Sequence, residues 1–307
     1  MNLTVRTILV NRFGELRSGW RILLFVLLLS LFGALLVAPV VLSGIRSQDL
    51  AVLGITLALL AASYVMTRFV NRKPLAAIGL WLNRKAARDA AAGAGIGIAM
   101  MAGIFVVEFA LGYAKPEWQG FAPGQAGLAV LRFAVMFVLA AALEELLFRG
   151  YAFQTLMQAI TFVPAMVLVS ALFALAHAQN PNSTLFGLFN VALAGIWLSF
   201  AYLKTRGLWL PTGLHFGWNF AQTALFGFPT SGAGFAGEKP VSILQSGPDW
   251  VTGGAFGPEG GVLATISLIA GTWYILKSKA FSQPPGVVTL ESVEDLLRPQ
   301  NGDGGLA

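Results

Sequence analysis

Residues 21–43 read RILLFVLLLSLFGALLVAPVVLS, a stretch that contains no charged residue after Arg21. A helix needs about 20 apolar residues to cross the hydrocarbon core of a bilayer, so this stretch predicts a transmembrane helix. Basic residues precede it, as in a signal peptide, but the apolar run is longer than the roughly 7–15 residues of a signal-peptide core. We therefore expect an anchor that stays in the protein.

The rest of the 307-residue chain has the same apolar character. It is 56% hydrophobic and 11% charged, with a mean hydropathy of +0.73, whereas about a quarter of the residues of a soluble domain are charged. We predict an all-α polytopic membrane protein in which about eight transmembrane helices form one bundle. The predicted spans lie near residues 21–43, 50–70, 90–113, 127–149, 158–178, 185–204, 207–228 and 261–276.

The basic residues predict the topology. If the N-terminus is cytoplasmic, every one of the 20 Lys and Arg residues except Arg46, Lys115, Arg132 and Lys239 falls on the cytoplasmic side. This positive-inside pattern places both termini in the cytoplasm. The net charge of +6 is dispersed between apolar spans, which is typical of topology determinants and does not favour a nucleic-acid partner. We expect a multi-pass protein of the cell (inner or plasma) membrane, and the absence of cysteine favours a bacterial origin.

Three segments outside the predicted spans differ in character. Residues 1–20 place apolar side chains at helical spacing between arginines, which predicts an amphipathic helix on the inner membrane surface, with an ordinary cytoplasmic extension as the alternative. Residues 229–260 are rich in Gly and Pro, and we expect an ordered cap because Trp250 and Phe256 need packing partners. Residues 279–307 predict a mobile cytoplasmic tail with one short helix around 291–296.

Two adjacent acids lie near the end of the fourth predicted span. Glu145 and Arg149 are four residues apart and share one helix face, where an ion pair neutralises both charges. Glu144 is rotated by about 100° from Glu145 and points elsewhere. We therefore expect Glu145 and Arg149 to hold a site together and Glu144 to take part in a reaction. The alternative is an ordinary salt-bridged helix end at the membrane interface.

The chain has two histidines, and both lie in predicted spans. His177 follows Phe173 by four residues, and His215 precedes Asn219 by four, so each pair shares a helix face. Each pair alone is compatible with structural hydrogen bonds between helices. Ionisable residues inside a membrane are costly, however, and three spans that contribute an acid and two imidazoles favour a functional site.

Two chemistries fit this set of residues. In the first, Glu144, His177 and His215 bind zinc and leave a position open for water. In the second, no metal is needed: Glu144 and His177 deprotonate water, while His215 and Asn219 donate hydrogen bonds to the developing oxyanion. The HExxH pattern of many zinc proteases is absent, and no cysteine is available as a nucleophile or metal ligand.

These residues resemble a known family. Glu144-Glu145-x-x-x-Arg149, Phe173-x-x-x-His177 and His215-x-x-x-Asn219, in this order on successive predicted helices, are similar to the motifs of the CPBP intramembrane proteases. That family includes type II CAAX prenyl endopeptidases and bacteriocin-processing or immunity proteins. The approach to the last motif, TRGLWLP at 205–211, is also similar, and the resemblance covers residues 127–225.

The resemblance implies an eight-helix bundle, here expected over residues 21–278 with a protease core at 127–225, and a site within the membrane that opens toward the cytoplasm. It implies the water-activating and oxyanion-stabilising roles given above, with Phe173 in support, by a zinc or a metal-independent glutamate mechanism. The implied partners are membrane lipid and a membrane-bound or lipidated, CAAX-like substrate, which the protein cleaves as an endopeptidase. The alternatives are a transporter or channel that uses the same residues as a proton or ion relay, and a non-catalytic immunity-type protein.

The depth of His177 conflicts with this arrangement. Glu144 and His215 lie about 10 Å from the inner ends of their spans at 1.5 Å per residue, whereas His177 comes late in an outward-running span. We therefore expect the fifth helix to begin well after Phe162, with the polar turn 179–183 sunk into a water-filled cavity.

Overall fold

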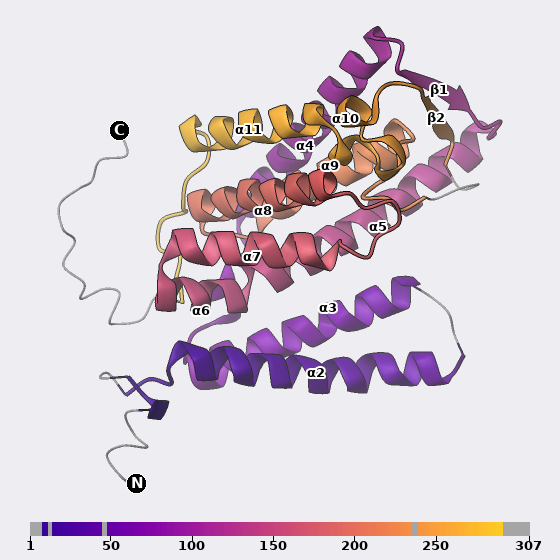
Figure 1. Cartoon of the computed structure of the whole chain (residues 1–307). Helices are drawn as coiled ribbons and strands as arrows, with labels where there is room; N and C mark the ends of the chain where they lie inside the picture. Colours follow the sequence, from indigo (N-terminus) through magenta and orange to yellow (C-terminus); the bar gives the residue numbers. More distant parts are fainter. Residues whose placement is uncertain (1–7, 12–13, 45–47, 235–238, 291–307) are drawn as a thin grey trace.

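The computed structural model describes residues 8–11, 14–44, 48–234 and 239–290, and most of them are helical (Figure 1). The helices are α2 (Ser18–Leu42), α3 (Gln48–Val65), α4 (Arg84–Ala110), α5 (Pro123–Arg149), α6 (Tyr151–Ile160), α7 (Phe162–Ala176), α8 (Leu185–Thr205), α9 (Trp209–Phe220), α10 (Asp249–Thr252) and α11 (Val262–Lys277). Two π-helical turns, η1 (Met66–Val70) and η3 (Ala221–Leu225), continue α3 and α9. Short 3-10 turns are η2 (Leu75–Ile78), η4 (Gly254–Phe256) and η5 (Pro258–Gly260).

Helices occur at all eight predicted positions, but they differ in length. Among the described residues, five helical segments are long and apolar enough to cross a membrane. These segments are Ser18–Leu42, Leu50–Val70, Arg84–Ala110, Pro123–Ile160 and Leu185–Thr205. The helices α7 and α11 are apolar but shorter. A mostly helical membrane protein is therefore confirmed, whereas the number of eight spans and the cytoplasmic position of both termini stay predictions.

The fifth predicted span is built differently from our expectation. The chain kinks at Gly150, where a Cβ atom would lie 2.1 Å from the carbonyl oxygen of Leu146, and a separate helix, α6, follows. The helix α7 then begins at Phe162, so the expectation of a later start is wrong. Pro164 lies in the first turn of α7, where a missing backbone N–H is tolerated.

A two-stranded sheet departs from the all-α prediction. Strand β1 (Ala114–Trp118) pairs antiparallel with β2 (Val241–Gln245), with Ala114 opposite Gln245 and Trp118 opposite Val241. The sheet joins the α4–α5 connection to the segment that precedes α11 (Figure 1). It was not predicted because the two strands are short and far apart in the sequence.

The segment between η3 and α11, residues 226–234 and 239–261, is called the cap below. It is ordered in its described part and contains β2, α10, η4 and η5. Phe256 is 1% exposed and packs against Phe173, Ala174 and Val191, as the prediction of a packed cap requires. Trp250, in contrast, is 65% exposed, so the expectation that it packs inside is wrong.

The two terminal segments are described only in part. Residues 279–290 pack along the bundle, because Phe281 and Leu290 are buried and the Lys73 ammonium donates a hydrogen bond to the Thr289 carbonyl over 2.7 Å. The mobile cytoplasmic tail stays a prediction, and the predicted helix at 291–296 lies outside the described residues. Of the predicted amphipathic segment 1–20, residues 18–20 belong to α2, and residues 1–7, 12 and 13 lie outside the description.

The helices α4 and α9 approach each other through glycines. Gly93 and Gly97 of α4 face the segment of α9 that contains Gly213 and Gly217, and a Cβ atom on Gly217 would lie 2.1 Å from the carbonyl oxygen of Ala94. Small residues spaced by four allow two helix backbones to touch in a membrane protein. The rotation of α9 against α4 is therefore fixed, and with it the direction of the polar side chains on α9.

We predict that Gly217→Ala destabilises the protein, because the added methyl group overpacks the contact between α4 and α9 at a cost of about 1–3 kcal/mol. Thermal unfolding in detergent measures this effect as a lower midpoint. Gly95→Ala is the matched control, since its Cβ atom meets nothing within 4 Å and alanine favours a helix over glycine. Equal midpoints for the two variants would contradict the prediction.

Candidate active site

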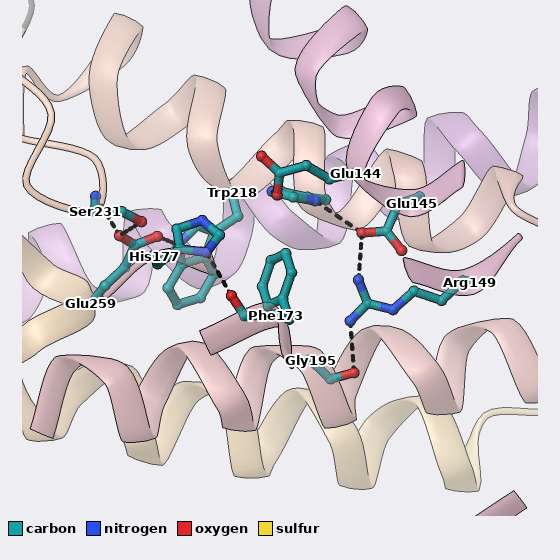
Figure 2. Close-up of polar contacts among 10 residues, drawn as sticks. Glu144, Glu145, Arg149, Phe173, His177, Gly195, Trp218, Ser231 and Glu259 are labelled. Carbon is teal, nitrogen blue, oxygen red and sulfur yellow. Dashed lines mark hydrogen bonds and ion pairs between the residues drawn. The ribbon is translucent and has the colours of Figure 1, made fainter. Parts of the chain in front are cut away.

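Arg149, in the last turn of α5, joins three helices inside the protein. Its side chain is 0% exposed, and Nη1 donates to Glu145 Oε1 over 3.1 Å. Nη2 donates to the carbonyl oxygen of Gly195 on α8 over 2.9 Å, and the guanidinium lies 5.0 Å from the centre of the Phe173 ring on α7 (Figure 2). The expected contact between Glu145 and Arg149 is present, and it extends to α7 and α8.

Glu145 also binds a histidine from α9. The Nδ1 atom of His215 lies 3.0 Å from Glu145 Oε1, the oxygen that accepts from Arg149. An ionised carboxylate only accepts hydrogen bonds, so Nδ1 is the protonated nitrogen in this pair. Glu145 is 0% exposed, and its two partners tie α5 to α9.

Glu144 has a different environment from its neighbour. Its Oε2 lies 3.8 Å from His215 Nε2, which is longer than a hydrogen bond. Within the described part of the chain this oxygen is buried without a hydrogen-bond partner, although the side chain as a whole is 28% exposed. The two adjacent acids differ in engagement and exposure. Oε1 of Glu145 accepts from two donors and its side chain is 0% exposed, although its Oε2 is also buried without a partner. Glu144 is 28% exposed and accepts no hydrogen bond from the described residues.

His177 follows the last residue of α7 and is positioned by Phe173. Its Nδ1 lies 2.8 Å from the carbonyl oxygen of Phe173 and donates to it, which leaves Nε2 on the other side of the ring. The Phe173 ring contacts both imidazoles, with centroids 4.8 Å from His177 and 6.0 Å from His215. Figure 2 shows the ring between His177 and Arg149.

One cavity of about 40 Å³ brings the candidate residues together. A volume of this size holds a few water molecules when polar groups line it. Its polar lining comes from α7, α8, α9 and the cap: His177, Asn190, Trp197, His215, Trp218, Asn219, Ser231 and Glu259. Three of the four predicted catalytic residues thus share a cavity, and Glu144 lies beside it through its approach to His215.

The cavity extends along α8, so His177 and His215 can both line it although they contact different elements. Its lining on α8 runs from Asn190 to Leu198, a distance of about 12 Å at 1.5 Å per residue. His215 contacts the acids of α5, whereas His177 lies near the cap. The turn 179–183 does not sink into the cavity as expected; it contacts the cap instead, where Asn180 Nδ2 donates to the carbonyl oxygen of Ser231 over 3.0 Å.

Three polar residues of the lining were missed by the sequence reasoning: Asn190, Ser231 and Glu259. Asn190 lies in an apolar helix and Ser231 in a glycine-rich segment, and neither position has a distinctive spacing. Glu259 offered a weak signal, as an acid between Pro258 and two glycines. The contacts that bring these residues to the site span the whole C-terminal half of the chain.

The predicted zinc ligands do not form a compact ligand set. His215 Nδ1 is bound to Glu145 and His177 Nδ1 to Phe173, which leaves both Nε2 atoms for other partners. The described residues contain no group of three or more His, Asp or Glu side chains that could hold a metal ion. Glu144, His177 and His215 are therefore not preassembled as a three-ligand zinc site in this arrangement, and the chemistry below uses the side chains alone.

Fold and site together define a membrane protein whose helices enclose an acid and imidazole site around a water-sized cavity. Residues 126–221 match the family model described as type II CAAX prenyl endopeptidase Rce1-like. The family predicted from the three motifs is thus confirmed: the chain contains an Rce1-like domain, from a family of proteases, and this domain includes all seven predicted site residues. No protein of curated function and no solved structure matches the chain.

We predict that Glu145→Gln and Glu144→Gln differ in stability although the residues are adjacent. Glu145→Gln leaves the buried charge of Arg149 without its counterion, which costs about 3 kcal/mol or more, whereas Glu144→Gln breaks no hydrogen bond that the structure shows. Thermal unfolding in detergent should show a lower midpoint for Glu145→Gln alone. Equal stability of the two variants would contradict the division between a structural and an available acid.

Proposed function

We propose that the protein is an intramembrane endopeptidase that hydrolyses a peptide bond near the C-terminus, or next to the membrane anchor, of a lipidated or membrane-bound substrate. The Rce1-like domain supports the class of reaction. The observation that carries the proposal is the cavity shared by His177, His215 and Asn219, with Glu144 at its edge. Membrane lipid surrounds the bundle, and we place the protein in the plasma membrane of a bacterium.

In this proposal Glu144 and His177 activate the water. A general base needs a lone pair that no other donor occupies, and the partnerless Oε2 of Glu144 meets this condition. His177 uses Nδ1 for the Phe173 carbonyl, so Nε2 is its functional nitrogen. The cavity that His177 lines has the volume for water, and Glu144 lies at its edge beside His215. The water gives its proton to this pair and attacks the scissile carbonyl, and the pair then protonates the leaving amine.

His215 and Asn219 stabilise the oxyanion in the proposed reaction. They lie one turn apart on α9 and line the same cavity. Glu145 holds the Nδ1 atom of His215, which leaves Nε2 for the cavity. In the proposed scheme a protonated His215 donates from Nε2–H, while Asn219 supplies an amide N–H. Donors held in place before the reaction are effective because they need no reorganisation.

Glu145, Arg149 and Phe173 support the site in this scheme without touching the substrate. Glu145 orients the His215 ring, Arg149 compensates the charge of Glu145, and the Phe173 carbonyl orients His177. Zinc bound by Glu144, His177 and His215 stays the alternative, and elemental analysis of active protein purified in detergent distinguishes the two. If the active protein contains one equivalent of zinc, and if removal of this zinc lowers cleavage in proportion, the zinc mechanism is favoured.

We predict that Glu144→Gln abolishes cleavage, with kcat lowered at least about 100-fold, because an amide cannot take the proton of water. Purified protein is assayed on a library of membrane-inserted and lipidated peptides. Asp249→Asn, which removes an exposed acid of the cap, should cleave like the wild type. Cleavage by Glu144→Gln at the wild-type rate would exclude Glu144 as the base.

We predict that Asn219→Asp lowers kcat about 100- to 1,000-fold, because it keeps the size of the side chain but removes the N–H donor. A proton or ion relay would tolerate this change, since its ionisable residues Glu144, His177 and His215 all remain. Cleavage and proton flux are measured in the same reconstituted vesicles. Unchanged cleavage, or flux in the wild type without any cleavage, would favour the relay over the protease.

A further inference from the structure

Glu259, in η5 of the cap, binds both the cap and α9. Its Oε2 accepts hydrogen bonds from the backbone N–H and the hydroxyl of Ser231, each over 2.6 Å. Its Oε1 accepts from Trp218 Nε1 of α9 over 3.2 Å (Figure 2). The acceptor in all three bonds is a carboxylate, and hydrogen bonds to an ionised carboxylate are charge-assisted and strong. The carboxylate, Ser231 and Trp218 all line the cavity that contains His177.

The backbone of the cap is strained where it meets Glu259. Ser231 has φ +46°, in the left-handed region that few residues other than glycine adopt. Gly232 follows with φ +79°, and a Cβ atom there would lie 1.7 Å from the carbonyl oxygen of Pro181. A conformation of this kind persists where its surroundings hold it. The two hydrogen bonds from Ser231 to Glu259 supply that restraint.

A second set of bonds fixes the backbone of Glu259 to α8. Asn190 Nδ2 donates to the carbonyl oxygens of Glu259 over 2.8 Å and of Gly261 over 3.0 Å. The Oδ1 atom of Asn190 accepts from the Thr265 hydroxyl on α11 over 2.7 Å. The position of the Glu259 side chain is thus defined from α8, α9 and the cap at once.

The closed cap limits what the cavity admits. At about 40 Å³ the cavity has room for water, whereas ligand-binding pockets usually have about 300–1,000 Å³. Ser231 and Glu259 form its wall on the cap side. Displacement of these two residues would therefore open the cavity on its cap side.

We infer that Glu259 is a further positioning residue of the site, which ties the cap to α9 and keeps the cap end of the cavity closed. Trp218 precedes Asn219 and lies three residues after His215, so its indole bond to Glu259 also restrains the face of α9 that carries both. The closure can be tested by itself, and its effect on catalysis rests on the proposed function.

Closure is measured by cysteine labelling, because the chain contains no cysteine of its own. Ala194→Cys places a thiol in the cavity lining. Trp250→Cys places a thiol on the cap at a position that is 65% exposed, and its labelling shows on which side of the vesicle the cap lies. A membrane-impermeant maleimide on that side should label Ala194→Cys slowly. Adding Glu259→Met should raise the rate at least about tenfold, since three hydrogen bonds to a carboxylate are lost.

The matched control for labelling is Glu117→Gln, which removes an exposed acid of β1 away from the cavity and should leave the rate unchanged. Trp218→Phe, which removes the N–H donor together with part of the indole ring, should raise the rate by a smaller factor and serves if Glu259→Met does not fold. Equal labelling rates with and without these changes would overturn the inference, whether or not the protein proves to be a protease.

The kinetic test uses the same variants on a cleaved peptide. Glu259→Met and Trp218→Phe should each lower kcat, by about tenfold for Glu259→Met, and change KM less than about twofold. Their double variant should be no slower than Glu259→Met, because both remove one shared bond. Additive losses, or an increase in KM alone, would show that Glu259 does not act through Trp218. A wild type that cleaves nothing refutes the proposed function, while the labelling result still decides the closure.

Discussion

The buried charge of Arg149 is the constraint on which the site depends. A guanidinium among apolar helices is stable only when its charge and its donors are compensated. The compensation comes from three helices, through the Glu145 carboxylate, the Gly195 carbonyl and the Phe173 ring. These helices can therefore associate in few other ways without leaving a charge unpaired. The need to satisfy one cation thus fixes the framework in which Glu144 lies.

The glycine contact between α4 and α9 complements this electrostatic constraint. It brings two backbones together so closely that α9 cannot rotate, while the bond between His215 and Glu145 restrains the same helix from its other side. Packing and hydrogen bonding act on opposite faces of α9. Neither alone determines the position of the His215 ring, since packing sets the helix axis and the hydrogen bond sets the rotamer.

The sequence alone predicts those contacts that depend only on local helix geometry. The spacing of Glu145 and Arg149 predicts their pairing because residues four apart meet on any helix, and the same rule separates Glu144 from them. It was insufficient where contacts are distant in sequence. The pairing of β1 with β2 and the placement of Glu259 against Trp218 depend on how loops return to the bundle, which no periodicity encodes. The late start expected for the fifth helix was wrong, because the sequence reasoning did not foresee the kink at Gly150 and the separate helix α6 before α7.

Under the proposed function, the two adjacent acids place a structural and a reactive carboxylate side by side on one helix. Both positions are near the same cation, so charge alone does not separate their roles. Their bonds do, because the Glu145 carboxylate accepts from Arg149 and His215, and protonation of this carboxylate would weaken both bonds and with them the framework. The other acid can change its protonation state without loss of a bond that holds helices together. A reactive group beside a rigid one therefore requires that the two share a helix but not a face, which is what consecutive positions on an α-helix provide.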